Sequence, residues 1–271
     1  MPELPEVETI IRALKPDLAG RIIISLRLLH PRVHRDTDPI RMCDNAKGAE
    51  IKDVYRRGKF IIFELSPGRT NLVAHLGMSG RLLTTDTPSD DKHLRALFEL
   101  SGNIFLNFID IRTFGKLFNL EGKIPPGFKN LGVEPLSSKF TSSRFSGMLA
   151  GRTTDIKTLL LRQDLIAGIG NIYASEALFI SRIHPARAGE DLLTREICSL
   201  HKTIRKVLHN AIDQMGTTFS DYRKPDGSPG NFGNSLTVYG RDGSPCIRCK
   251  TNLERINQHG RSTFFCPQCQ H

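Results

Sequence analysis

The sequence predicts an α+β protein with two domains: an N-terminal antiparallel β-sandwich with a helix at its start, and a C-terminal helical domain that ends in a zinc-ribbon finger. Three observations predict this architecture. The chain has 271 residues, more than one core usually organises. Short β-branched segments fill its first half, whereas apolar residues spaced three and four apart fill its second half. Four of its six cysteines lie close to the C-terminus.

The first half should begin with a short helix. Pro5 can occupy a first helical turn, and apolar residues from Val7 to Leu14 follow at the spacing of one buried stripe, before Gly20 ends the helix. Six segments then have the β-branched content of strands, and turn sequences rich in Gly, Ser and Pro separate them: residues 21–29, 50–57, 60–65, 70–78, 94–100 and 104–110. These segments predict the antiparallel sandwich.

The second half should be helical. Residues 121–139 are rich in Gly, Pro and Ser and are typical of a linker. Helical spacing follows in residues 140–150, 156–162, 172–183 and 190–214. Residues 216–235 are too long for a passive connection, so we expect a flexible functional loop there. The expected boundaries are 1–130 for the sandwich, 131–237 for the helical domain with its loop, and 238–271 for the finger.

The charge of the chain favours a polyanionic partner. Its 38 Lys and Arg residues exceed its 28 Asp and Glu residues and leave a formal charge of +10, which is typical of proteins that bind nucleic acid. No apolar run approaches the ~20 residues of a membrane span, and the acidic N-terminus lacks the features of a signal peptide. We therefore expect a cytoplasmic protein that does not enter a membrane.

The cysteine pairs predict a metal site. Cys246 and Cys249 form one C-x-x-C pair, and Cys266 and Cys269 form a second. Four thiolates complete a tetrahedron and leave no position for water, so the expected ligand is one structural Zn²⁺ per chain. Between the pairs, Gly260 suggests a hairpin tip that presents Arg261. A guanidinium held there could bind phosphate, although a solvated charge is the simpler interpretation.

The N-terminal residues could supply an amine nucleophile. Removal of Met1 would leave Pro2 with a free secondary amine, whose pKa of ~7.7–8.0 keeps a useful fraction neutral, compared with ~10.4 for Lys. Such amines attack sugar aldehydes, and Glu3 stands next to it, where it could move a proton. Helix capping offers an alternative reason for both residues, because Pro and Glu are favoured at helix N-termini.

Together these features resemble the bacterial formamidopyrimidine-DNA glycosylase family. The resemblance extends over the whole chain and rests on five motifs in the same order and spacing: Pro2-Glu3-Leu4-Pro5-Glu6-Val7-Glu8-Thr9, Arg56-Arg57-Gly58-Lys59, His75-Leu76-Gly77-Met78-Ser79-Gly80, Gly168-Ile169-Gly170-Asn171-Ile172-Tyr173 and the terminal cysteine pairs. It implies that the helical domain contains a helix–two-turns–helix motif.

The resemblance also implies a reaction, namely removal of 8-oxoguanine and formamidopyrimidines from duplex DNA followed by β,δ-elimination at the abasic site. Pro2 would be the nucleophile, Glu3 would move protons at the sugar and Lys59 would assist base release. Arg261 would grip a phosphate. The partner would be damaged double-stranded DNA, bound by a monomer.

Further residues match the DNA contacts of the family. An everted nucleotide leaves a hole in the duplex, and Met78, Arg112 and Phe114 match the side chains that fill it. Two more, Lys157 and Asn171, match residues that hold DNA phosphates, and His93 and Arg152 match further DNA contacts.

The sequence departs from the family pattern at residues 92–95, 110–114 and 155–158, all near these expected DNA contacts. Two other functions share much of the sequence signal. An endonuclease VIII-like glycosylase would use the same nucleophile on oxidised pyrimidines. A non-catalytic zinc-ribbon protein would bind DNA without reacting, and persistence of Met1 would favour it.

Overall fold

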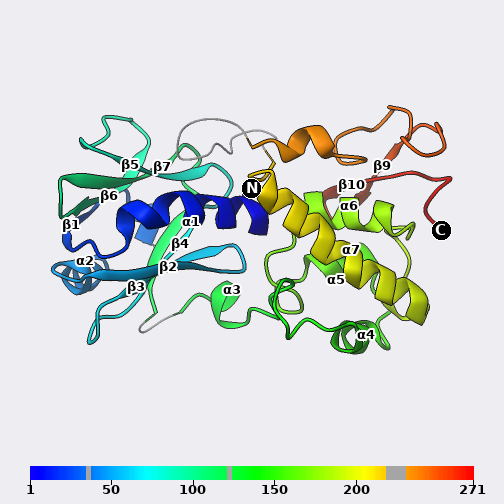
Figure 1. The fold of residues 1–271 in the computed structure, drawn as a ribbon, viewed down its shortest axis with the longest axis horizontal. Helices are drawn as coiled ribbons and strands as arrows, with labels where there is room; N and C mark the ends of the chain where they lie inside the picture. The colour runs from blue at the N-terminus through cyan, green and yellow to red at the C-terminus, as the bar shows by residue number, and fades with distance from the viewer. Residues whose placement is uncertain (35–37, 121–123, 218–229) are drawn as a thin grey trace. The chain divides into compact units, whose positions relative to one another are not determined.

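A computed structural model describes residues 1–34, 38–120, 124–217 and 230–271. These residues belong to two compact units, which Figure 1 traces by colour along the chain. The sheet unit contains residues 1–129 and 214–231, and the helical unit contains residues 130–213 and 232–271. The three-part division expected from the sequence stays a prediction.

The sheet unit is built from two four-stranded antiparallel sheets that follow helix α1 (Leu4–Leu18). In spatial order, the first sheet contains β1 (Ile23–Leu28), β6 (Leu94–Leu100), β7 (Ile104–Asp110) and β5 (Gly80–Thr85). The second contains β2 (Ile51–Arg57), β3 (Phe60–Leu65), β4 (Leu72–His75) and β8 (Lys116–Asn119). Figure 1 shows β5, β6 and β7 in one layer and β2 and β3 in the other.

One core joins the two sheets to α1. Leu14 of α1 is fully buried in the same apolar cluster as Phe63 of β3 and Phe98 of β6, whose ring centroids lie 6.0 Å apart. The stripe of apolar residues that predicted α1 therefore faces the interior of the sandwich. The predicted α+β fold class, with an antiparallel sandwich behind an N-terminal helix, is confirmed.

The expected strand 70–78 is shorter than predicted. Strand β4 ends at His75, and Gly77 has a φ of +61°, which turns the chain before β5. Strands β5 and β8 and helix α2 (Pro39–Ala46) were not predicted. Strand β8 has four residues, too few to show a period, and α2 depends on the Asp38 side chain, which accepts the N–H groups of Ile40 and Arg41.

The helices of the second half lie within a few residues of their predicted positions. They are α4 (Ser142–Leu149), α5 (Ile156–Leu161), α6 (Asn171–Ile180) and α7 (Thr194–Asp213). Short elements complete the described residues: α3 (Pro126–Lys129) in the predicted linker and the 3₁₀ turns η1 (Pro31–His34), η2 (Gly189–Asp191) and η3 (Phe232–Ser235). Among all described helices, none is long and apolar enough to cross a bilayer.

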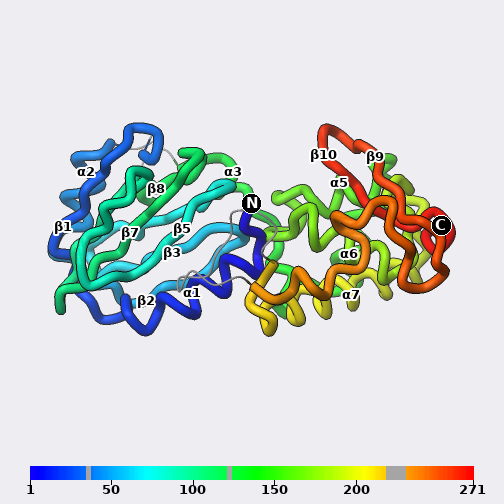
Figure 2. Tube along the Cα trace, turned by 90° about the horizontal axis from the view of Figure 1, so that it is seen from above, coloured from blue at the N-terminus to red at the C-terminus, as the bar shows by residue number. Residues whose placement is uncertain are grey.

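The terminal finger contains the hairpin of β9 (Glu254–Gln258) and β10 (Arg261–Phe265), drawn in orange and red in Figure 2. Its apolar residues Leu253 and Phe264 cluster with Phe179 of α6. The guanidinium of Arg248 lies 4.4 Å from the Phe179 ring centroid and donates a hydrogen bond to the Phe179 carbonyl at 2.8 Å. The finger is therefore packed onto α6.

Candidate active site and nucleic-acid interface

The N-terminal residues are held by a capping box. Pro2 and Glu3 are buried, and Glu3 is the N-cap residue of α1. The carboxylate of Glu6 accepts the backbone N–H of Glu3 at 2.8 Å, and the Glu3 side chain accepts the N–H of Glu6 in return. Capping therefore accounts for both acidic residues, and it also fixes the direction of the peptide that bears Pro2.

The second oxygen of Glu6 binds a distant segment. It accepts the backbone N–H of Thr217 at 2.7 Å, and Thr217 pairs with Asn231 in an isolated antiparallel bridge. A Cβ on Gly216 would lie 2.9 Å from the same Glu6 oxygen. The backbone at residue 216 can therefore come this close to Glu6 only because the residue is glycine. The base of the predicted loop 216–235 is thus fixed beside the N-terminus, while residues 218–229 of that loop lie outside the described residues.

Lys59 lies in the turn between β2 and β3 and is 6% exposed. Arg56 connects this turn to α1, because its Nε lies 3.2 Å from a carboxylate oxygen of Glu8 and its Nη1 donates to the Gly58 carbonyl at 3.0 Å. Pro2, Glu3 and Lys59 therefore belong to one connected part of the sheet unit.

His75 lies near Lys59 and is neutral at physiological pH. Burial, followed by the charges of Lys59 and Lys116, lowers the pKa of His75 to about 4. Its Nδ1 can then accept the backbone N–H of Gly77 at 3.2 Å. This hydrogen bond sets the start of the turn that presents Met78.

The three expected hole-filling residues project from two loops of the sheet unit. Met78 is 37% exposed and Phe114 is 50% exposed, so both side chains are accessible from solvent. The guanidinium of Arg112 lies 5.0 Å from the Phe114 ring centroid. Ile111, one of the departures, is 53% exposed beside them.

The carbonyl of His93 accepts the backbone N–H of Asp110 at 2.9 Å, next to the loop that carries Arg112 and Phe114. Its Nδ1 is 3.0 Å from the guanidinium of Arg95, and Arg95 Nε donates to the Asp110 carbonyl at 2.8 Å. The departure at residues 92–95 therefore connects two neighbouring strands in this protein.

Lys157 and Asn171 both hold the finger hairpin in the helical unit. Lys157 is 1% exposed, and its Nζ donates to the Ser262 carbonyl at 3.0 Å and to Thr263 Oγ1 at 2.5 Å. Asn171 Nδ2 donates to the same Ser262 carbonyl at 2.9 Å. Both side chains thus fix the backbone directly after Arg261, and their contact with phosphate stays a prediction.

A second set of contacts holds the tip of the hairpin. Asp155 is the N-cap of α5, and its carboxylate lies 3.1 Å from Nε2 of His259. A cavity of about 200 Å³ beside the tip is lined in part by Arg162 and Arg261. Arg152 is half-buried near α5, and its carbonyl accepts a backbone N–H at 3.1 Å.

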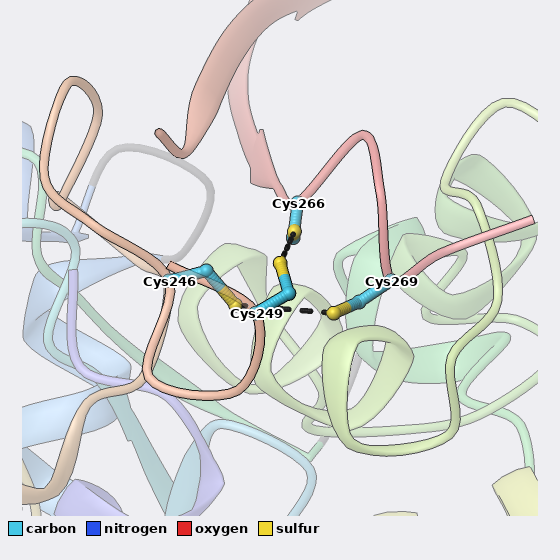
Figure 3. Close-up of side chains that lie close together, drawn as sticks. All are labelled: Cys246, Cys249, Cys266 and Cys269. Carbon is cyan, nitrogen blue, oxygen red and sulfur yellow. Dashed lines mark hydrogen bonds between the residues drawn. The ribbon is translucent and has the colours of Figure 1, made fainter. Parts of the chain in front are cut away.

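The four cysteines of the finger form one cluster, shown in Figure 3. Their sulfur atoms all lie within 4.8 Å of one another, with Cys246 and Cys269 at 4.0 Å and Cys249 and Cys266 at 3.4 Å. Tetrahedral zinc at ~2.3 Å from each sulfur separates the sulfurs by about 3.8 Å, so the cluster fits Zn²⁺. Hydrogen bonds from Thr251 lower the pKa of Cys249 to about 6, which favours the ligating thiolate.

Three family models match consecutive parts of the chain. The formamidopyrimidine-DNA glycosylase N-terminal domain matches residues 1–117, the formamidopyrimidine-DNA glycosylase H2TH domain matches residues 131–222, and the zinc finger found in FPG and IleRS matches residues 243–271. The chain belongs to the formamidopyrimidine-DNA glycosylase family. The resemblance stated from the motifs is thereby confirmed.

Relatives and solved structures of the formamidopyrimidine-DNA glycosylase family extend the match over the full length. The formamidopyrimidine-DNA glycosylase of Symbiobacterium thermophilum is 45% identical over all of this chain and 89% of its own. The crystal structure of MutM (Fpg) from Thermus thermophilus superposes with a TM-score of 0.89, at 42% identity over 99% of this chain and 98% of that chain. A Lactococcus lactis FPG mutant bound to Fapy-dG DNA matches with a TM-score of 0.90, at 35% identity over 99% of both chains.

Some residues of this family member were not singled out from the sequence. Asp110 is 1% exposed and accepts hydrogen bonds from both loops that carry the hole-filling residues, yet it entered the sequence analysis only as part of a departure. An acidic residue at the end of a mostly apolar strand was the available signal. Glu6 appeared in the sequence analysis only as part of the N-terminal motif, and its contact with Thr217 spans 211 residues.

Proposed function

We propose that Pro2 is the nucleophile with which this chain removes oxidised purines from duplex DNA. The chain is a base excision repair glycosylase with lyase activity at abasic sites, as its family and its full-length relatives show. Solved relatives hold DNA that contains Fapy-dG or carbocyclic 8-oxo-G. The observation that carries the proposal is the burial of Pro2 and Glu3, with Glu6 fixing the peptide between them.

In the proposed reaction the lone pair of the Pro2 nitrogen forms a bond to C1′ while the bond from C1′ to the base breaks. The departing base takes the bonding electrons and a proton, and Lys59 assists this step. The adduct then loses the Pro2 N–H proton, and the C1′–O4′ bond breaks while O4′ takes a proton, which opens the sugar and gives an iminium. A secondary amine has no second N–H to lose, so the iminium stays cationic. It therefore acts as an electron sink for β- and then δ-elimination, in which Glu3 moves protons at the sugar.

The remaining residues are proposed to hold the DNA. Arg261 would bind a backbone phosphate, in a position that Lys157 and Asn171 fix through the adjacent Ser262 carbonyl. Met78, Arg112 and Phe114 would fill the hole left by the everted nucleotide, as their exposure supports. His93 and Arg152 are proposed to make further DNA contacts.

One zinc ion per chain is proposed to bind Cys246, Cys249, Cys266 and Cys269. A closed set of four thiolates has no position for substrate, so the ion would supply rigidity to the finger and take no part in bond breaking. The hairpin that carries Arg261 lies between the two cysteine pairs, and β10 ends directly before Cys266.

The proposed setting is the bacterial cytoplasm, because the proposed substrate is chromosomal DNA and the relatives named above are bacterial. We propose that the chain acts as a monomer. An endonuclease VIII-like enzyme is not favoured, because full-length relatives carry the formamidopyrimidine name. A non-catalytic DNA-binding protein is not favoured for the same reason.

Borohydride trapping tests the nucleophile. Incubation with an 8-oxoguanine:cytosine duplex and borohydride should yield a covalent complex whose adduct maps to the N-terminal peptide beginning at Pro2, because reduction makes the iminium permanent. Pro2→Gly should keep some trapping through its primary amine, whereas retention of Met1 should abolish it. Lys59→Ala should weaken base excision and leave trapping on an abasic site intact. An adduct on Lys59 would refute the assignment.

A further inference from the structure

Asp110 joins the two loops that carry the proposed hole-filling residues. It ends β7, and its side chain is 1% exposed. One carboxylate oxygen accepts the hydroxyl of Ser79 at 2.6 Å and the backbone N–H of Arg112 at 3.2 Å. The other oxygen accepts the backbone N–H of Gly115 at 2.7 Å. Three donors from two separate loops therefore meet at one buried carboxylate.

Each of these donors lies at or beside a residue proposed to enter the duplex. Ser79 directly follows Met78, and Gly115 directly follows Phe114. The third donor is the N–H of Arg112 itself, which also donates to Ser79 Oγ at 3.1 Å. Through these contacts the carboxylate sets the backbone from which all three side chains extend.

The same two loops touch each other through their backbones. Gly77 has a φ of +61°, and a Cβ there would lie 2.6 Å from the carbonyl carbon of Phe114 and 2.7 Å from the nitrogen of Gly115. Such distances are too short for any side chain. Residues 76–79 and 111–115 therefore form one block, which we call the insertion block.

The insertion block contains an unfavourable backbone conformation that its neighbours maintain. Thr113 has a φ of +55°, which is rare for a β-branched residue. It lies between Arg112 and Gly115, both of which donate to Asp110. A strained residue persists when its surroundings determine its position, and such residues concentrate at functional sites.

The backbone of Asp110 is itself held from behind. Its carbonyl accepts a hydrogen bond from Arg95 Nε at 2.8 Å, and its N–H donates to the His93 carbonyl at 2.9 Å. The carboxylate is thus presented from a fixed strand end.

We propose that Asp110 is a positioning residue that prearranges Met78, Arg112 and Phe114 for insertion into DNA. This inference rests on the proposed function of those three side chains. Prearrangement matters because each side chain would otherwise have to be ordered while the nucleotide leaves the duplex. Asp110 touches no DNA itself and acts through the backbone of the insertion block.

Asp110→Asn is the sharpest variant, because the amide keeps the size of the carboxylate and places an NH₂ group against an O–H or N–H donor. Insertion can be followed by stopped-flow fluorescence of 2-aminopurine next to 8-oxoguanine in a duplex, since unstacking raises its emission. We expect the fluorescence change to slow by about 10- to 100-fold. Borohydride trapping on a single-stranded abasic oligonucleotide should keep its wild-type rate, because a single strand has no hole to fill.

Two further variants keep the test decisive. Asp17→Asn alters a carboxylate elsewhere in the sheet unit, which accepts the Thr84 hydroxyl at 2.7 Å, and it should leave insertion unchanged. Ser79→Ala removes one of the three donors to Asp110 and should slow insertion less than Asp110→Asn does. If Asp110→Asn does not fold, the insertion rate of Ser79→Ala still tests the positioning role.

Three results distinguish failure of the positioning role from failure of the proposed nucleophile. Insertion at the wild-type rate in Asp110→Asn and Ser79→Ala would overturn the positioning role. Equal slowing of insertion and single-strand trapping would also overturn it and indicate a general loss of structure. A wild-type protein that changes 2-aminopurine emission but traps no DNA would refute the proposed nucleophile and leave the positioning role supported by its own variants.

Discussion

The Nζ of Lys157 lies 2.5 Å from Oγ1 of Thr263, across 106 residues of sequence. The ammonium is buried, and its second hydrogen bond goes to the Ser262 carbonyl. A cation that the sequence predicts as a phosphate contact therefore fixes the strand that begins with Arg261.

Lys157→Met should weaken DNA binding by about tenfold, because the hairpin that presents Arg261 loses two hydrogen bonds from a charged donor. Fluorescence anisotropy with a duplex that contains an abasic-site analogue measures the affinity. If Lys157 acts through Arg261, the effects of Lys157→Met and Arg261→Gln should not add in the double variant. Additive losses, with a separate decrease in salt dependence, would show that Lys157 contacts phosphate directly. Lys202→Gln, on an exposed face of α7, is the control.

Removal of zinc should abolish DNA binding while the sheet unit stays folded. Metal coordination of about 10–16 kcal/mol would outweigh the small apolar cluster that joins Leu253 and Phe264 to α6. We expect one zinc per chain by metal analysis, and Cys249→Ser should speed hydrogen exchange in β9 and β10 but not in β2 and β3. An active preparation without zinc would contradict this prediction.

Stability should fall as the pH is lowered from about 6.5 to 4, partly because of His75. The folded state lowers the pKa of His75 to about 4, so in this window the unfolded chain binds a proton that the folded chain does not. The free energy of unfolding therefore decreases with falling pH, by up to about 3 kcal/mol from this residue. Urea unfolding at several pH values measures the slope, which His75→Gln should flatten. Equal slopes in both proteins would refute the assignment.

Glu6→Gln should lower the rate of borohydride trapping on an 8-oxoguanine duplex by more than a control variant with the same loss in free energy of unfolding. The carboxylate accepts the N–H groups of Glu3 and Thr217, and an amide would present NH₂ to one of them. Thr9→Val is the control, because it also removes a buried hydrogen bond of α1, from the Thr9 hydroxyl to the Pro5 carbonyl at 2.8 Å. Both variants should lose about 1 kcal/mol in urea unfolding. If both trap DNA equally fast, Glu6 has no role beyond capping.

Sequence patterns predicted the helices and strands that are long enough to show a periodicity of their own. Strands β2 and β3 are long enough for their β-branched content and the turn between them to be visible, and α7 has a clear apolar stripe. Strand β8 has four residues and depends on pairing with β4, so its own sequence contains no pattern that predicts it. The cluster of four cysteines was predictable because two C-x-x-C pairs almost specify it.

Contacts between distant segments could not be predicted from the sequence. Lysine is normally exposed, and the burial of Lys157 depends on two polar partners more than 100 residues away. The positions of Pro2, Glu3 and Lys59 in one unit were likewise implied by family resemblance, whereas the network of Glu8 and Arg56 that connects them is visible only in the folded chain.

The hydrogen bond between Glu6 and Thr217 has a consequence for biosynthesis. A ribosome that adds about 5–20 residues per second delivers Thr217 some 10–40 seconds after Glu6. Throughout that interval the anchor beside Pro2 lacks one of its two backbone donors. The sheets can pair early, but the hydrogen bonds of Glu6 are completed only when the segment after α7 has returned to it. The start of α1, although translated long before Thr217, is therefore among the last parts of the sheet unit to reach its final arrangement.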